Sequence, residues 1–135
     1  MSPIGQRPDR QRSILIGVTV SFYQRIGGEF AVSSAVDALY RVVLSDDRLA
    51  GYFDGVDVDR LSGHMVALLS QVLGGPADYT GRDLRGAHRH LGITTEHYHL
   101  VGAYLLGVLA GLGADEEVLA AVRQVLAASA EDVID

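Results

Sequence analysis

The 135-residue chain contains no cysteine and no lysine. The absence of cysteine excludes disulfides, thiolate zinc sites, iron–sulfur clusters and cysteine nucleophiles. Because lysine is absent, all 11 lysine-or-arginine positions are arginines, and they are outnumbered by 17 acidic side chains, which gives a formal net charge of −6. An acidic chain without a basic stripe is a poor partner for nucleic acids or anionic membranes, and we expect neither as a partner.

The chain also has no apolar run that approaches the ~20 residues of a membrane-spanning helix. The segment from Ile14 to Phe22 follows three arginines, as the apolar part of a signal peptide does, but Gly17, Thr19 and Ser21 interrupt it. No small-residue cleavage site follows, so we expect a cytoplasmic protein. Hydrophobic residues make up 48% of the chain, which predicts a single domain with a sizeable core.

The pattern of apolar residues is helical throughout. Residues 1–19 are predicted to form a polar arm and the start of the first helix, and residues 20–135 to form the domain. Apolar side chains recur at three- and four-residue steps in five segments. They are 18–26, 29–44, 58–72, one that follows a cap at Thr94 or Thr95, and one after Gly113-Ala114-Asp115 that carries Val118 to Val133. The fourth stripe consists of Tyr98, Val101, Leu105, Leu109 and Leu112. Alternating strand patterns are absent from the sequence, and the predicted fold class is all-α.

Glycines and aspartates separate these segments. Gly27-Gly28 follows the first, and Gly74-Gly75-Pro76 ends the third firmly. The Ser45-Asp46-Asp47 sequence ends the second segment and is suited to cap a brief turn that runs to Phe53. Residues 75–83 are predicted to be mostly loop, followed by about two helical turns around His88.

His88 is the residue with the clearest possible chemistry. A histidine on a short helix that faces a long apolar helix is one way in which a protein holds haem iron. A lone histidine near an apolar face is more often a structural residue, so His88 by itself does not decide between the two roles. Other motifs occur in register with it. They are Tyr23 to Gly28, Leu39-Tyr40, Asp46-Asp47, Tyr52-Phe53, Leu73 to Pro76, Tyr79-Thr80-Gly81 and Gly92-Ile93-Thr94.

Together with His88, these motifs resemble the truncated haemoglobins of group I, the bacterial and protist globins with a two-over-two helical sandwich. The resemblance extends over residues 20 to 134 and implies a non-covalent haem b. It implies that His88 is the proximal ligand of the iron, that Tyr40 is the distal donor to bound dioxygen, and that Phe53 stacks against the haem plane. No histidine follows His99, so the covalent link between a histidine and haem that some relatives have lacks a candidate in the last helix.

The resemblance also implies the remaining walls of the haem pocket. Apolar walls are expected from Leu61, Met65, Leu84, Ile93, Tyr98, Val101 and Leu105. Without lysine, the candidate cations for the haem propionates are Arg60, Arg85 and Arg89, although each is equally well explained as a solvated arginine. His90, His97 and His99 are interpreted as surface or packing residues.

The distal helix departs from the pattern of many relatives, which carry a polar residue at the position of Leu61 or Met65. Tyr40 and His64 are therefore the candidate polar groups on the distal side. His64 matches a histidine that binds the iron as a sixth ligand in some cyanobacterial relatives. The alternative is a histidine on the exposed flank of its helix, near the propionates.

The resemblance and the expected haem pocket lead to two functional hypotheses, and a third alternative remains beside them. The first is reversible binding and transport of dioxygen, with nitric oxide and carbon monoxide as further ligands, by a monomer or weak dimer. The second is nitric oxide dioxygenation, which converts nitric oxide and dioxygen to nitrate and needs an external reductase. That activity needs a route for nitric oxide, for which Leu69, Gly102 and Gly107 are the candidate residues. The third is a haem-free helical interaction domain.

Overall fold

The computed structural model describes residues 21–76 and 91–134, and these residues form helices. They comprise α2 (Phe22–Ile26), α3 (Gly28–Leu44), the 3-10 helix η2 (Ala50–Phe53), α4 (Val58–Val72), α6 (Thr95–Gly111) and α7 (Glu116–Val133). No strand occurs among the described residues. The prediction of an all-α fold is therefore confirmed. Leu84, Arg85, His88, Arg89 and His90 lie outside the described residues.

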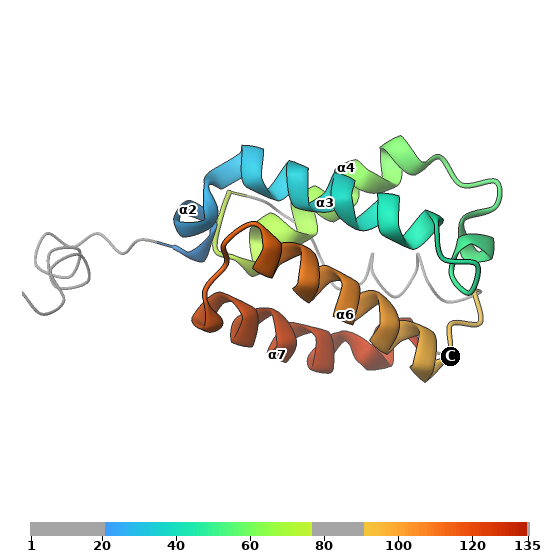
Figure 1. Ribbon diagram of the computed structural model, residues 1–135. Coiled ribbons are helices and arrows are strands. Elements are labelled where there is room, and N and C mark those ends of the chain that lie inside the picture. The colour runs from blue at the N-terminus through green and yellow to red at the C-terminus, as the bar shows by residue number, and fades with distance from the viewer. Residues whose placement is uncertain (1–20, 77–90, 135) are drawn as a thin grey trace, which may run out of the picture.

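The four long helices form two layers (Figure 1). Helix α3 packs against α4 in one layer, α6 packs against α7 in the other, and contacts of α3 with α6 and of α4 with α7 join the layers. This arrangement is the predicted two-over-two sandwich. None of the helices in the described parts of the chain is long and apolar enough to cross a membrane.

Side-chain caps mark the starts of α2, α4, α6 and α7. Ser21 and Gln24 form a reciprocal capping box at the start of α2, and the side chains of Asp57, Thr94 and Asp115 accept backbone N–H bonds at the starts of α4, α6 and α7. Such caps satisfy backbone donors that have no partner within the helix. The sequence left the cap of α6 open between Thr94 and Thr95, and the structure identifies it as Thr94.

The first helix and the end of α4 form a tight corner. The backbone N–H of Tyr23 donates to the carbonyl oxygen of Leu73 over 2.8 Å. A Cβ atom built on Gly75 lies 2.5 Å from two atoms of the Tyr23 ring. That separation is well inside van der Waals contact, so glycine at position 75 allows the ring to lie against the backbone.

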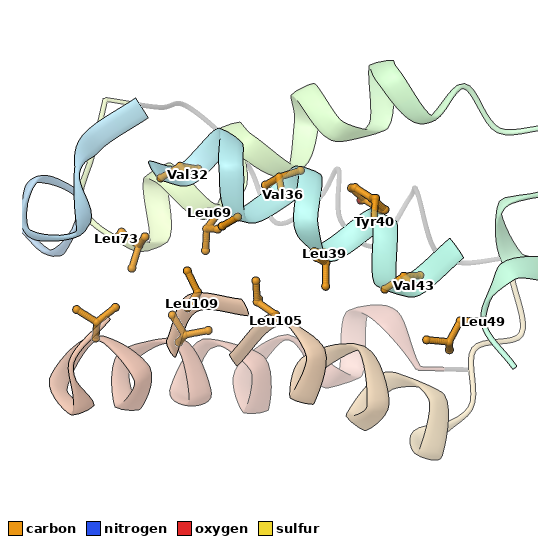
Figure 2. Close-up of a cluster of buried hydrophobic side chains, with 13 residues drawn as sticks. Val32, Val36, Leu39, Tyr40, Val43, Leu49, Leu69, Leu73, Leu105 and Leu109 are labelled. Carbon is orange, nitrogen blue, oxygen red and sulfur yellow. The ribbon is translucent and has the colours of Figure 1, made fainter. Parts of the chain in front are cut away.

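The core lies between the two layers. Its members come from α3, α4, α6 and α7, with Leu49 added from the turn before η2. Figure 2 shows Leu39, Leu69, Leu105 and Leu109 meeting in the space between the layers. The predicted stripe on α6 is correct for Leu105 and Leu109, which are 8% and 1% exposed, but wrong for Leu112, which is 45% exposed. Leu112 is the C-cap that follows the last residue of α6, and there the chain leaves the helix.

Two groups of polar contacts join the elements at the surface. Arg25 of α2 forms ion pairs with Asp115 and Glu117 at the start of α7. In the turn after α3, the carboxylate of Asp46 accepts hydrogen bonds from the backbone and guanidinium of Arg48 and from the hydroxyl of Tyr104 on α6. The bonds from Arg48 and then from Tyr104 hold the pKa of Asp46 far below its usual value.

Candidate functional site

An apolar cavity of about 300 Å³ lies between the helical layers. Its size is at the lower end of the range of about 300–1,000 Å³ that is usual for small-molecule sites. Side chains from α3, η2, α4, α6 and α7 line it. The predicted site residues among them are Tyr40, Phe53, Leu61, His64, Met65, Ile93, Tyr98, Val101 and Leu105.

Tyr40 and Phe53 form one corner of the cavity. Tyr40 stands on the buried face of α3 and is 7% exposed. Phe53, the last residue of η2, meets it edge to face, with ring centroids 5.8 Å apart and an interplanar angle of 80°. This arrangement is favourable for two aromatic quadrupoles. The short turn between α3 and η2 therefore brings the two predicted residues into contact.

Helix α4 supplies a second wall. Leu61, Met65 and Leu68 follow one another at steps of three and four residues, so they lie along one face of the helix. All three line the cavity and are half-buried. His64 is exposed but also lines the cavity, which places it at the margin. Arg60, in the first turn of α4, is exposed and is not among the lining residues.

A further wall comes from the segment just before α6 and from the first turns of that helix. Ile93, Tyr98 and Val101 line the cavity and are half-buried. The Tyr98 hydroxyl donates over 2.6 Å to the backbone carbonyl oxygen of Leu126 on α7. Burial, followed by the nearby charge of Asp132, raises the pKa of Tyr98. Tyr98 therefore contributes its ring to the cavity wall while its neutral hydroxyl is used to join α6 to α7.

The sequence interpretation missed a contact between Tyr52 and His97. The Tyr52 hydroxyl lies 2.7 Å from Nδ1 of His97, and both residues line the cavity. A signal for His97 was present in the sequence, because His97 and Val101 are four residues apart on α6. Such residues share one face of a helix. His99 is exposed, as expected for a surface residue.

The cavity continues from the aromatic corner toward α7. Its lining there includes Leu69, Gly102, Val122, Leu126 and Ser129. Leu69 and Gly102, two of the candidate residues for a nitric oxide route, both line this part of the cavity. Gly107 is exposed and is absent from the lining, so its assignment to that route was wrong. It lies five residues beyond Gly102 on α6, and a step of five residues turns to another face of a helix.

The lining suits a haem group. A porphyrin is large, flat and mostly apolar, and this cavity offers aliphatic walls, the aromatic face of Phe53 and few polar groups. The described residues contain no cluster of three or more histidine, aspartate or glutamate side chains able to hold a metal ion. A haem in this cavity would take its iron ligand from one histidine, and the predicted one, His88, lies outside the described residues.

Comparisons with known proteins agree with this geometry. The family model for bacterial-like globins matches residues 21–134. A group 1 truncated haemoglobin of Mycolicibacterium paratuberculosis is 35% identical over 113 residues, which cover 84% of this chain and 83% of that protein. One from Synechocystis is 38% identical over 114 residues, covering 82% and 92% of the two chains. A crystal structure of the 2/2 haemoglobin of Synechococcus, in the cyanomet state with covalently attached haem, matches with a TM-score of 0.77 and 27% identity, over 84% of this chain and 98% of that one.

Proposed function

The chain belongs to the bacterial-like globin family and is a haem-binding, ligand-binding globin, and we propose that it binds dioxygen reversibly for transport or storage. Membership of this family argues against the third hypothesis, a haem-free helical interaction domain. When bound, haem supplies an iron atom that takes dioxygen, nitric oxide and carbon monoxide. The protein's own side chains decide how long such a ligand stays.

The observation that carries the proposal is the position of Tyr40 in the cavity. Its phenol belongs to a side chain buried beside Phe53, and Leu61 and Met65 on the facing helix are apolar. Bound dioxygen carries partial negative charge on its outer oxygen, which a phenol can stabilise by donating a hydrogen bond. A hydrogen bond to a charged partner contributes about 1.5–3 kcal/mol. Tyr40 is thus suited to retain dioxygen in preference to a less polar ligand.

The residues that hold the haem follow from the same assignment. His88 is proposed as the proximal ligand, with its second ring nitrogen donating to a backbone carbonyl so that the ring orientation is fixed. Phe53, Ile93 and Val101 hold the plane of the group. Arg60, which is exposed at the start of α4, is the described candidate for a propionate partner.

Reversibility is the property that tests this proposal. The reduced protein is titrated with dioxygen and then returned to argon while its visible spectrum is recorded. We expect a stable oxygenated spectrum that reverts fully to the deoxygenated one. Immediate conversion to the ferric form at the first addition of dioxygen would contradict a transport or storage role.

The extension of the cavity toward α7 favours a second candidate, nitric oxide dioxygenation. Leu69, Gly102, Val122 and Leu126 continue the apolar lining beyond the aromatic corner. An apolar route of this kind admits nitric oxide while dioxygen occupies the site. Nitrate formation over many turnovers, with nitric oxide, dioxygen and an added reductase, tests it. A single turnover that stops at the ferric protein would favour the transport role.

We place both activities in the cytoplasm and in a monomer or weak dimer.

A further inference from the structure

The hydrogen bond between Tyr52 and His97 joins two titratable side chains at the cavity. The phenol oxygen of Tyr52 lies 2.7 Å from Nδ1 of His97, the typical length for a strong hydrogen bond. The two rings are 5.6 Å apart and nearly perpendicular, with an angle of 77°. Both side chains are half-buried and both line the cavity that suits the haem. In the imidazole tautomer whose Nδ1 carries no proton, His97 accepts the hydrogen bond of the Tyr52 phenol at this cavity.

Two other described tyrosines, Tyr98 and Tyr104, have partners that are poor proton acceptors. Tyr98 donates to the backbone carbonyl of Leu126, and an amide oxygen is too weakly basic to hold a proton near neutral pH. Tyr104 donates over 2.5 Å to Asp46, whose pKa is lowered by Arg48, so that carboxylate is a weak base. Tyr104 also lies outside the lining of the cavity. Imidazole, in contrast, is the side chain that most readily exchanges protons near neutral pH.

This difference matters for the oxidation of a phenol. Loss of an electron makes the phenolic O–H a strong acid, so the electron leaves readily only where a base takes the proton at the same time. We propose that Tyr52 is a redox-active residue that gives one electron to the haem site after hydrogen peroxide has reacted there, while its proton passes to Nδ1 of His97. The product is a neutral tyrosyl radical next to a protonated imidazole. This inference rests on haem binding and is independent of reversible dioxygen binding.

The proposed activity is peroxide reduction at the expense of a small one-electron donor, such as ascorbate or a phenol. In each half-cycle the O–H bond of Tyr52 breaks, the electron goes to the haem site and the proton to His97. The donor then returns an electron to the Tyr52 oxygen, the proton moves back from His97, and the donor releases a proton to water. Two half-cycles supply two electrons to the haem site, and the peroxide oxygens take up two protons from water, which match the two that the donors release. One hydrogen peroxide is thereby converted to two waters. Two donor molecules are oxidised.

Freeze-quenched electron paramagnetic resonance tests the assignment. The ferric haem-loaded protein is mixed with hydrogen peroxide, and ring-deuterated tyrosine identifies a tyrosyl signal by its narrowed hyperfine splitting. We expect the signal in the wild type and its loss in Tyr52→Phe, which removes the hydroxyl and retains the ring. Tyr104→Phe is the matched control, because it also loses a bonded hydroxyl, and it should keep the signal. His97→Asn, which accepts the hydrogen bond but cannot hold the proton, should form the radical more slowly.

Several results would overturn the proposal. They are the absence of a tyrosyl signal in the wild type, an unchanged signal in Tyr52→Phe at equal haem occupancy, or its loss only when Tyr40 or Tyr79 is replaced by phenylalanine. Tyr79 lies outside the described residues and is included for this reason. If Tyr52→Phe binds less haem, a nitroso spin trap added to the wild-type protein locates the radical without the use of a variant. The peptide that contains Tyr52 should then carry the adduct, and an adduct found elsewhere would refute the assignment.

Discussion

At the scale of single residues, the distal side of the cavity has an uneven distribution of polar groups. Tyr40 presents a phenol from α3, whereas Leu61 and Met65 present apolar side chains from α4. His64 lies between them in sequence but is exposed at the margin of the cavity. We therefore propose that the retention of a bound ligand depends mainly on the hydroxyl group of Tyr40, and secondarily on whether His64 moves inward.

Replacing Tyr40 by phenylalanine tests the first of these dependences. The ring and its edge-to-face contact with Phe53 are kept, so the packing should change little. Dioxygen should dissociate roughly tenfold faster or more, because ~1.4 kcal/mol corresponds to one decade in an equilibrium constant. Stopped-flow dissociation of the oxygenated protein measures this rate. A rate equal to that of the wild type would show that Tyr40 is a packing residue.

His64 provides a second prediction at this scale. Its neighbour Gly63 has open space around it, and glycine lowers the cost of a local change in a helix by about 0.5–1 kcal/mol relative to alanine. We expect part of the ferric protein to be low-spin, with His64 bound to the iron. His64→Ala should abolish it and speed ligand association. Coincident spectra of the two proteins in both oxidation states would leave His64 as a residue on the helix flank.

The sequence was most informative about single residues that lie on a periodic stripe. Tyr40, Phe53 and Ile93 were assigned to the pocket by the resemblance, and Val101 by the helical spacing as well. The pairing of Tyr52 with His97 was missed, because it joins residues 45 positions apart through a turn whose path the sequence does not specify. The positions of His88 and of the arginines Arg85 and Arg89 remain predictions.

At the scale of elements, the boundaries of the helices were predictable because they depend on local chemistry. Caps at Asp57, Thr94 and Asp115 act within three residues, and the left-handed backbone of Gly27, with a φ of 118°, ends α2 where the glycine pair predicted. The contact between the start of α2 and the end of α4 was not predictable. It depends on a close approach of Tyr23 to Gly75, which are far apart in sequence.

Gly75→Ala tests this corner. The new methyl group would meet the Tyr23 ring at 2.5 Å, so the ring or the backbone must shift. Overpacking of this kind typically lowers the free energy of unfolding by about 1–3 kcal/mol. Gly107→Ala is the matched control, because Gly107 is exposed within α6 and has no atom within 4 Å of the added carbon. That change should raise the free energy of unfolding by about 0.4–1 kcal/mol. Urea unfolding measures the stability of both variants. Equal stability of Gly75→Ala and the wild type would contradict the close packing of the Tyr23 ring on Gly75.

The turn after α3 gives a prediction about pH. Hydrogen bonds from Arg48 and Tyr104 lower the pKa of Asp46 in the folded state. A lowered pKa means that the contribution of Asp46 to stability is complete above its unfolded pKa of about 3.9 and is lost as pH falls below it. Asp46→Asn should therefore be less stable than the wild type near neutral pH, and the difference should shrink in acid.

The control for this prediction is Asp37→Asn, in the exposed middle of α3. Urea midpoints of the three proteins are compared at intervals from neutral pH down to about pH 3, just below the unfolded pKa of aspartate. A difference between Asp46→Asn and the wild type that stays constant over this range would show that the carboxylate does not link the turn to α6 through its charge.

At the scale of the whole molecule, the two helical layers leave an apolar cavity where a protein of this size normally closes its core. Interiors are usually packed to the density of organic crystals, with few voids larger than a water molecule. A cavity of about 300 Å³ among half-buried aliphatic and aromatic side chains is thus unusual for a structural domain, and it is explained by a resident haem. The central claim is that this haem is bound to the protein through His88.

The visible absorption spectrum of His88→Ala, compared with the wild type, tests that claim most directly. The wild type should purify with one non-covalent haem b, extractable into acidified organic solvent, and with an intense Soret band. His88→Ala keeps the apolar cavity and removes the proximal ligand, so it should bind haem poorly until imidazole is added in its place. An unchanged Soret band and full haem occupancy in His88→Ala without imidazole would contradict the account.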